Sequence, residues 1–236
     1  MANERTGPAY AIIVAAGRSE RMGGVDKVFA QLAGRPLLAW TLAAFKRCEA
    51  IDNIIVVASD ASLRRMRGFV QEWRFDAKVT AVVPGGATRQ DSVRAGLEAA
   101  PGADIVAVHD GARPLVTAEI IARGVALARE TGAALCAVPA RDTVKQVAGD
   151  PPVVTGTPAR EGLWLAQTPQ CFDRELLLRA HREAENTLAT DDAALVEALG
   201  HPVTVYEGAW SNFKVTTQED IIIAEALLRE RFTSGA

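Results

Sequence analysis

Two cations in a glycine-containing loop are the first residues of this sequence whose types and spacing could do chemistry. The segment follows a short apolar run, contains Gly17, and carries Arg21 and Lys27 six positions apart. Glycine lets backbone N–H groups approach oxygen atoms closely, and Arg and Lys supply the positive charge that a triphosphate requires. The loop could therefore wrap a polyphosphate, although by itself it is also compatible with a surface turn that carries solvated charges.

The spacing in this loop differs from two widespread nucleotide-binding motifs. It matches neither the GxxxxGK[ST] pattern of P-loop enzymes nor the GxGxxG pattern of dinucleotide-binding enzymes. The ribose-binding acid of a dinucleotide site is also missing from its place, since Asp60 lies far more than about 20 residues beyond Gly17. A P-loop ATPase and a dehydrogenase are therefore disfavoured.

Three other segments carry residues suited to binding a nucleotide. Gly85 and Gly86 stand before a helix start, where backbone groups can approach a flat base or an anion. Asp110 ends an apolar run, and a carboxylate at that position can hold Mg²⁺ against phosphate oxygens. Lys214 comes just before the last predicted helix. Each of these taken alone could also be a tight turn, a turn-forming acid or a solvated charge.

The order of the predicted elements bears on this choice. Short β-branched runs alternate with longer segments of helical period, and the runs are 10–16, 54–59, 79–83, 105–109 and 134–138. Such alternation predicts an α/β fold with a parallel sheet and helices on both faces. Ligands of these sheets bind beyond the carboxyl ends of the strands, so the loops would meet at one edge. Their convergence favours a nucleotide site over unrelated turns.

Helix signals place the remaining elements. Thr88 with Asp91, and Thr117, are predicted to open helices. Further helices are expected at about 173–185 and 191–199, with a strand near 203–206. The chain would close with a strand around 212–215 and a helix on which Thr216 and Glu219 form a capping box.

The alternating pattern breaks between about 141 and 162. Polar residues there flank a Gly-Asp-Pro-Pro turn, which predicts a β-hairpin. The hairpin is too polar for a sheet buried on both faces, so we expect it to project as an arm. A projecting two-stranded arm is marginal by itself, and a partner subunit is the expected cover.

Composition excludes several classes of protein. Of 236 residues, 49% are hydrophobic and 23% charged, which suits one globular domain spanning 1–236. The net charge of -3 lacks the broad basic surface of nucleic-acid-binding proteins, and no apolar run approaches the roughly 20 residues that span a membrane. Three widely spaced cysteines and three histidines show no zinc-ligand spacing, so a reduced, cytoplasmic protein is expected.

Seven motifs in these segments resemble, in the same order, those of the 2-C-methyl-D-erythritol 4-phosphate cytidylyltransferase family. They are VAAGRSERMGGVDK, GGATRQDSV, HDGARP, RDTVK, LAQTPQ, TDDAAL and NFKVT. HDGARP together with TPQ and KVT is the specific part, whereas AAGxxxRM alone indicates only a nucleotidyltransferase. The resemblance implies a Rossmann-like domain, a homodimer joined through the arm, and transfer of a cytidylyl group from CTP to methylerythritol phosphate in non-mevalonate isoprenoid synthesis.

The resemblance also implies roles in binding CTP, with Mg²⁺ or another divalent cation as cofactor. The residues that would act in catalysis are Arg21, Lys27 and Lys214. Those that would line the phosphates with them are Ala15, Ala16 and Gly17, and those that would recognise cytosine are Gly86, Ala87 and Ser92. Asp110, the implied metal ligand, and Gly111 would lie beside the ribose.

A second set of roles concerns the sugar phosphate. The residues that would face it are Arg113, Thr168, Thr190 and Lys214, and those that would reach in from the other subunit's arm are Thr143 and Arg160. Two of the threonines have simpler interpretations as well. Thr190 would cap a helix whatever its ligand, and Thr168 precedes Pro169, where a turn is expected.

Three positions depart from the pattern of many relatives. Asp26 places an extra carboxylate beside Lys27, and Ser19 stands where a glycine is common. Ala87 replaces an acidic residue, so recognition of the base at that point must rest on backbone groups and on other side chains.

Nucleotidyl transfer proceeds by in-line attack of the acceptor phosphate on the α-phosphorus and needs no protein nucleophile. The attacking phosphate is already an anion near neutral pH, so a general base is dispensable and His109 is expected to be structural. Two alternatives stay open. The acceptor could be ribitol 5-phosphate or another polyol phosphate, or the chain could be a regulatory module that binds a nucleotide without chemistry.

Overall fold

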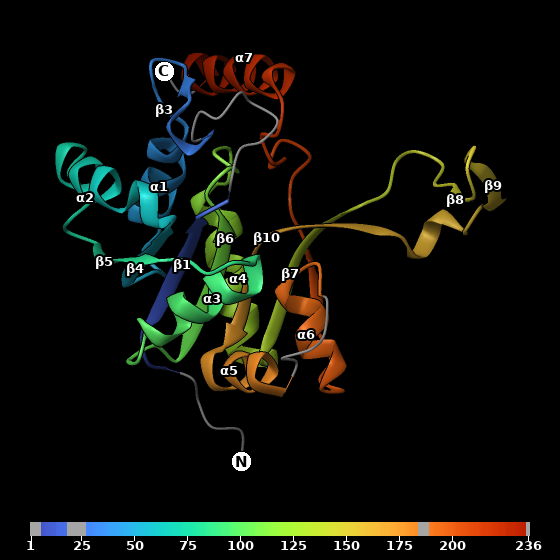
Figure 1. Cartoon of the computed structure of the whole chain (residues 1–236), viewed down its shortest axis with the longest axis horizontal. Helices are drawn as coiled ribbons and strands as arrows, with labels where there is room; N and C mark the ends of the chain where they lie inside the picture. The colour runs from blue at the N-terminus through green and yellow to red at the C-terminus, as the bar shows by residue number, and fades with distance from the viewer. Residues whose placement is uncertain (1–5, 18–26, 184–188, 235–236) are drawn as a thin grey trace.

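A seven-stranded sheet with the order β11-β7-β10-β6-β1-β4-β5 forms the centre of the molecule (Figure 1). The computed structural model describes residues 6–17, 27–183 and 189–234. The strands of the sheet are β1 (Ala9–Ala15), β4 (Asn53–Ala58), β5 (Val79–Pro84), β6 (Ile105–Asp110), β7 (Ala133–Pro139), β10 (Trp164–Asp173) and β11 (Thr204–Glu207). All pair in parallel except β10, which is antiparallel to both β6 and β7. The predicted α/β sheet, mostly parallel, is confirmed.

The register of the central strands brings their carboxyl ends to one level. Ala15 at the end of β1 lies opposite Ala58 of β4, and Ala58 lies opposite Pro84 of β5. On the other side of β1, Val14 lies opposite Asp110, the last residue of β6. The loops after β1, β5 and β6 therefore leave the sheet at the same edge, as the alternation of elements predicted.

Helices cover both faces of the sheet. They are α1 (Leu37–Arg47), α2 (Leu63–Glu72), α3 (Arg89–Glu98), α4 (Ala118–Thr131), α5 (Arg174–Glu183), α6 (Asp192–Ala198) and α7 (Gln218–Ser234). Alternate residues of β1 point to opposite faces, so Ile13 packs in the core beneath α1, α2 and α4. Its neighbour Ile12 packs with α3, α5 and α6. A third cluster joins α7 to α1 and to the small hairpin of β2 (Gln31–Leu32) and β3 (Arg35–Pro36).

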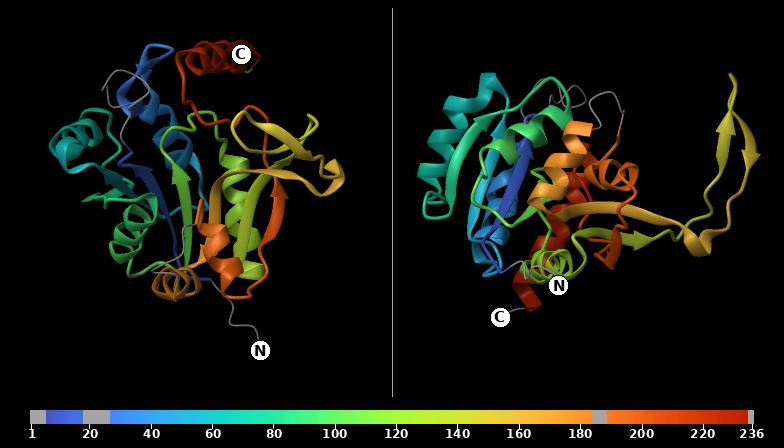
Figure 2. Two further views of the ribbon diagram at one scale, coloured as in Figure 1. Left: turned by 45° about the vertical axis from the view of Figure 1, so that its right-hand side comes forward. Right: turned by 90° about the horizontal axis from the view of Figure 1, so that it is seen from below.

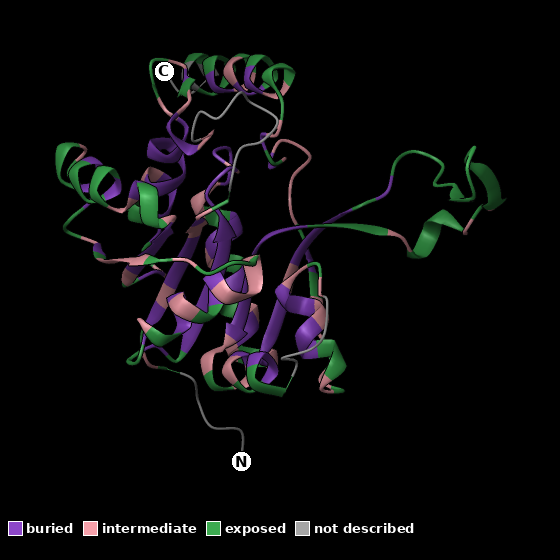
Figure 3. Cartoon of the chain, viewed as in Figure 1, coloured by how far each residue is buried: buried purple, intermediate pink, exposed green. Residues whose placement is uncertain are grey.

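The predicted arm is present and stands away from the sheet (Figures 1 and 2). It carries β8 (Gln146–Ala148), β9 (Val153–Gly156) and the 3-10 helix η4 (Arg160–Gly162), and β8 pairs only with β9. Its side chains are almost all exposed (Figure 3), including the apolar Val147, Val153 and Val154.

One predicted strand and one predicted helix cap are wrong. No strand forms at 212–215, because this segment is an irregular connection whose backbone bonds to the loop after β6 through Val215 N–H and Ala112 C=O, 2.8 Å apart. The last helix is capped one residue later than predicted. Thr217 and Asp220 exchange the two capping bonds, at 3.3 and 2.8 Å, and Glu219 takes no part in them.

One long strand was not predicted at all. β10 contains the LAQTPQ motif, whose polar residues and proline are unusual in a central strand. The structure accommodates Pro169 at an irregularity, since the pairing of β10 with β7 is interrupted between Ala166 and Gln170. In the part of the chain that the structure describes, no helix combines the length and the apolar character needed to cross a membrane.

Candidate active site

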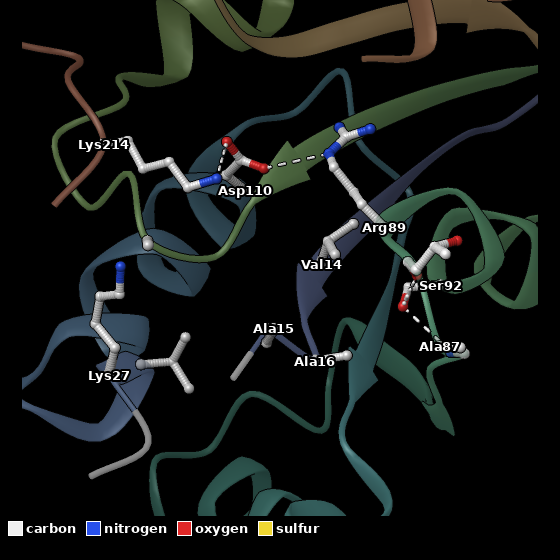
Figure 4. A pocket seen from close by; sticks show the side chains of 14 residues that line it. Val14, Ala15, Ala16, Lys27, Ala87, Arg89, Ser92, Asp110 and Lys214 are labelled. Carbon is white, nitrogen blue, oxygen red and sulfur yellow. Dashed lines mark hydrogen bonds and ion pairs between the residues drawn. The ribbon is translucent and has the colours of Figure 1, made fainter. Parts of the chain in front are cut away.

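A cavity of about 660 Å³ opens at the edge where the loops after β1, β5 and β6 meet. It is lined by Val14, Ala15, Ala16, Gly17, Lys27, Val28, Gly86, Ala87, Thr88, Arg89, Ser92, Asp110, Ala112 and Lys214. Figure 4 shows Lys27 and Lys214 reaching this cavity from different segments, with Asp110 beside Lys214. The structure thus brings together nine of the residues named from the sequence: Ala15, Ala16, Gly17, Lys27, Gly86, Ala87, Ser92, Asp110 and Lys214.

Lys27 is held at the cavity by the residues that follow it. It opens the 3-10 helix η2 (Lys27–Phe29), in which Val28 and Phe29 are buried. The ring of Phe29 packs edge-on against Phe69 of α2, with 5.5 Å between the ring centroids. Burial of these two side chains fixes the backbone from which the lysine extends.

The glycine loop after β5 is closed by hydrogen bonds to α3. The Ser92 hydroxyl accepts from Gly86 N–H at 3.2 Å and donates to Thr88 C=O at 2.9 Å. Thr88 and Asp91 form the predicted capping box. A side chain on Gly85 would lie 2.6 Å from the Ala16 Cβ, so glycine there allows the loops after β1 and β5 to touch.

Asp110 is the centre of a cluster of positive charges. Its carboxylate oxygens lie 3.1 Å from Lys214 Nζ, 3.4 Å from Arg113 Nε and 3.7 Å from Arg89 Nε. Burial raises the pKa of this carboxyl, but Lys214, Arg89 and Arg113 outweigh burial and bring the pKa down to about 2. Asp110 is therefore a carboxylate at neutral pH.

A buried network behind Asp110 fixes its backbone. The Thr168 hydroxyl accepts from Asp110 N–H at 3.1 Å and lies 3.0 Å from His109 Nδ1, to which it can donate. His109 Nε2 lies 3.2 Å from the carbonyl oxygen of Arg113, which can only accept, so Nε2 carries the ring proton. Burial lowers the pKa of His109 to about 3. His109 is thus a neutral interior residue, in line with the structural role expected for it.

The Lys214 segment is pinned at the same place. Asn212 is fully buried, and its side-chain amide donates to Thr168 C=O at 2.9 Å. The backbone carbonyl of Asn212 accepts from Arg113 Nη1 at 2.9 Å. Arg113 therefore joins Asp110 to the segment that carries the lysine, two residues before Lys214.

Sequence reasoning missed Arg89 and Asp192. Arg89 is the first residue of α3 and lines the cavity, and its Nη1 lies 2.7 Å from Asp192 Oδ2. Asp192 is buried at the start of α6 and also contacts His181 Nε2 at 3.3 Å. Both residues stand inside quoted motifs, GGATRQDSV and TDDAAL, and an arginine directly after a double-glycine loop was the available signal.

Several predicted residues lie elsewhere. Thr168 is buried behind Asp110, where its hydroxyl accepts from the Asp110 N–H, and it is not among the residues that line the cavity; its contact with a sugar phosphate stays a prediction. Thr190 is exposed and does not cap α6, because Asp191 is the capping residue and accepts from Ala194 N–H at 3.0 Å. Gly111 donates to Val14 C=O at 2.9 Å beneath the cavity.

Three predicted residues remain, namely Thr143, Arg160 and Arg21. Thr143 and Arg160 belong to the arm, which stands away from the sheet (Figure 1), and neither lines this cavity. Arg21, together with Ser19 and Asp26, lies outside the described residues.

The donor set suits a divalent cation that is held mainly by its substrate. No group of three or more His, Cys, Asp or Glu side chains with the geometry of a metal site occurs among the residues that the structure describes. Asp110 offers one ionised carboxylate, and Mg²⁺ in nucleotide sites is commonly bound by one or two carboxylates plus phosphate oxygens. The site can therefore bind a polyphosphate, with Lys27, Lys214 and Arg89 to stabilise negative charge.

Proteins similar to this chain share one activity in their names. The model of the 2-C-methyl-D-erythritol 4-phosphate cytidylyltransferase family matches residues 9–230. The protein of that name from Dehalococcoides mccartyi is 46% identical over 228 residues, which are 97% of this chain and 98% of the relative. The one from Geobacter metallireducens is 45% identical over 229 residues, covering 94% of this chain and 98% of the relative.

Solved structures agree with this result. The crystal structure of 4-diphosphocytidyl-2C-methyl-D-erythritol synthase from Anaerococcus prevotii has a TM-score of 0.82 and 33% identity, over 94% of this chain and 96% of that chain. The 2-C-methyl-D-erythritol 4-phosphate cytidylyltransferase from Thermus thermophilus has a TM-score of 0.76 and 37% identity, over 92% and 98%. The family resemblance of the seven motifs is confirmed, and the chain belongs to the 2-C-methyl-D-erythritol 4-phosphate cytidylyltransferase family.

Proposed function

We propose that this protein is a nucleotidyltransferase that uses CTP and 2-C-methyl-D-erythritol 4-phosphate. The products are 4-diphosphocytidyl-2-C-methyl-D-erythritol and pyrophosphate, in the non-mevalonate synthesis of isoprenoid precursors. Family membership over residues 9–230 supports the substrates and the reaction.

One observation carries the proposal at the level of chemistry. Lys27 and Lys214, which are far apart in the sequence, line the same cavity together with the ionised Asp110. A pair of fixed cations around one carboxylate suits a polyphosphate and its metal far better than a neutral ligand. A regulatory module without chemistry would not need both lysines at the reacting end of the nucleotide.

The chain acts by positioning and by electrostatic stabilisation. The phosphate oxygen of the acceptor attacks the α-phosphorus of CTP, and the bond to the pyrophosphate leaving group breaks on the opposite side. Lys27 and Lys214 draw negative charge from the α-phosphate and the leaving group, and the undescribed Arg21 is assigned the same task. Gly86, Ala87 and Ser92 present the loop after β5 to the cytosine base, with Ala15 to Gly17 along the phosphates.

Mg²⁺, or another divalent cation, completes this site in our proposal. When bound, the cation neutralises phosphate charge and fixes the triphosphate geometry. Asp110 would hold it, and in doing so would exchange its contact with Lys214 for one with the metal. Lys214 Nζ would then be available to the phosphates, while Arg113 and Arg89 stay in place to orient the carboxylate.

We further propose a homodimer joined through the arm. The arm exposes Val147, Val153 and Val154, and an isolated two-stranded hairpin with exposed apolar residues is marginally stable in water. A second subunit would cover these side chains, and the arm's Thr143 and Arg160 would then reach the sugar phosphate in the other cavity. The three cysteines are unpaired and buried, which is compatible with the reducing cytoplasm that we propose as its location.

A pyrophosphate-release panel tests the proposed activity. The purified protein is mixed with Mg²⁺, each of the four nucleoside triphosphates, and either methylerythritol 4-phosphate, ribitol 5-phosphate or erythritol 4-phosphate. We expect the fastest release with CTP and methylerythritol phosphate, and a product with the mass of the diphosphocytidyl alcohol. Faster release with ribitol 5-phosphate would reassign the acceptor, and no release with any pair would reject the proposed reaction.

A further inference from the structure

The segment Gly208–Val215, which carries Lys214, is built on the base of the arm. In Figure 1 it rises beside β7 and β10 where these two strands leave the sheet toward the arm. Hydrogen bonds fix this arrangement. Gly208 N–H donates to Ala137 C=O of β7 at 2.8 Å, and Gln167 of β10 donates to Ala209 C=O at 2.9 Å. The lysine segment therefore rests on both strands that continue into the arm.

A second set of contacts joins this segment directly to the first residues of the arm. The guanidinium of Arg141 lies over the ring of Trp210, 4.2 Å from the ring centroid. The carbonyl oxygen of Arg141 accepts from Arg160 Nη1 at 2.7 Å, which links the segment that leads into the arm to the segment that returns from it. Trp210 thus contacts Arg141, the residue whose backbone is bonded to the returning segment of the arm.

Trp210 lies only four residues before Lys214 in the chain. Asn212, two residues on, is buried and bonded to Thr168 and Arg113, and Lys214 follows after another two residues. The Lys214 side chain itself is 42% exposed and forms an ion pair with Asp110. Its position therefore depends on its backbone, which Asn212 and Val215 hold on either side of it, with the Trp210 stack two residues before Asn212.

We propose that Arg141 and Trp210 are positioning residues that couple the direction of the arm to the placement of Lys214 in the same subunit. This inference rests on the proposed function, because it makes the arm act on two sites. The arm would supply Arg160 to the partner's cavity, and the bond from Arg160 to Arg141 would pass any shift of the arm to Trp210. When a second subunit docks on the arm, it then fixes the position of Lys214 in the subunit to which that arm belongs.

Variants at the stacked pair test the coupling. Because the two side chains lie at the surface of the arm's base, truncation leaves the core intact. We expect Trp210→Ala and Arg141→Met each to lower kcat roughly 5- to 20-fold, since a lysine that stabilises the leaving group is displaced. KM for CTP should stay within about twofold, and Trp210→Phe, which retains a ring for stacking, should restore most of the turnover. The double variant should be no slower than the slower single variant, because each of the two single variants and the double variant loses the same Arg141–Trp210 contact.

A matched control separates this coupling from a general effect on the arm. Trp164→Ala removes another tryptophan at the arm's base, one that is 44% exposed on β10, and it should leave kcat unchanged. Light scattering should give the same assembly state for all variants. Equal kcat for Trp210→Ala and Trp164→Ala, or independent losses that multiply in the double variant, would overturn the proposal.

A structural readout keeps this test apart from the test of the proposed reaction. Hydrogen–deuterium exchange of peptides covering 208–215 should become faster in Trp210→Ala and in Arg141→Met, and not in Trp164→Ala. If the wild type released no pyrophosphate, the proposed reaction would be rejected. The difference in exchange between the variants would still show whether the Arg141–Trp210 contact holds the segment 208–215. Unchanged exchange in all three variants would contradict the coupling whatever the reaction.

Discussion

Asp110 and His109 are neighbours in the sequence with opposite charge states, and their surroundings explain both. Asp110 faces Lys214, Arg89 and Arg113, so it stays ionised although it is largely buried. His109 points to the other side, between the Thr168 hydroxyl and a backbone carbonyl, where a proton on Nδ1 would be buried without a countercharge in contact. The site therefore enters the reaction with a fixed anion and without a titrating imidazole.

The charge state of His109 predicts an acid-sensitive stability. Burial depresses its pKa to about 3, whereas the unfolded chain takes up this proton near pH 6.5. Its contribution is fully present above pH 6.5 and is lost as the pH falls toward 3, because only the unfolded state binds the proton in that window. Denaturant unfolding at pH 7 and pH 5 should differ by about 2 kcal/mol through this group. The same pH dependence in wild type and His109→Gln would contradict the assignment.

Residue types and their places after strands predicted the charged residues of the cavity. Lys27 and Asp110 lie where the carboxyl-end rule puts them, whereas Lys214 reaches the same cavity from an irregular segment that follows no strand directly. The direction in which a side chain points was harder to predict from the sequence. The hydrogen bond from the Asp110 N–H to the Thr168 hydroxyl depends on β10 lying beside β6, a pairing that no local pattern indicates. Arg89 was missed because the first residue of a helix usually points to solvent.

At the scale of elements, the turn between β5 and α3 depends on close packing without side chains. A Cβ on Gly86 would overlap the Cβ of Asp91, the residue that completes the capping box with Thr88. Ser92, one residue further on, bonds to the Gly86 N–H. The loop after β5 and the start of α3 are therefore one unit.

Gly86→Ala should accordingly impair the nucleotide site. We expect KM for CTP to rise roughly tenfold or more, because relieving the overlap with Asp91 must move the loop or open the cap. Gly68→Ala is the matched control, since Gly68 lies on α2 and a Cβ there meets nothing within 4 Å. That control should keep its KM and gain about 0.5–1 kcal/mol of stability. Steady-state kinetics and thermal unfolding measure both, and equal KM values in the two variants would contradict the packing argument.

Elements with a clear period were predicted well, and those shaped by tertiary contacts were not. The apolar runs that became β1, β4, β6 and β7 are mostly buried strands, for which hydrophobicity is a sufficient signal, and the run that became the edge strand β5 was found in the same way. β10 carries the polar Gln167, Thr168 and Gln170 in its buried middle and Pro169 at an irregular pairing, so its sequence looks like a turn. In the stretch 212–215, Phe213 and Val215 alternate with polar residues and pack in the cluster that includes α7, so the pattern imitates a strand.

At the scale of the whole molecule, the proposed dimer predicts complementation between two inactive variants. Lys27→Ala removes a side chain that lines the cavity and keeps Arg160 on the arm, whereas Arg160→Ala keeps every side chain that lines the cavity. Each should be nearly inactive alone. After subunit exchange at equal amounts, half of the dimers are mixed and one of their two sites is complete, which gives about a quarter of wild-type activity. No recovery after verified exchange would exclude an arm that serves the other subunit's cavity.

The central claim is that Lys27 and Lys214 act together on the reacting phosphates of one nucleotide. Single-turnover formation of the diphosphocytidyl product, with CTP and Mg²⁺ at saturation, tests it in Lys27→Ala, Lys214→Ala and the control Lys145→Ala, whose lysine lies on the arm beside Thr157. We predict that the rate falls roughly 10²- to 10⁴-fold in the first two variants with folding unchanged, and that the control retains wild-type chemistry. A rate near that of wild type in either cavity variant would contradict the account.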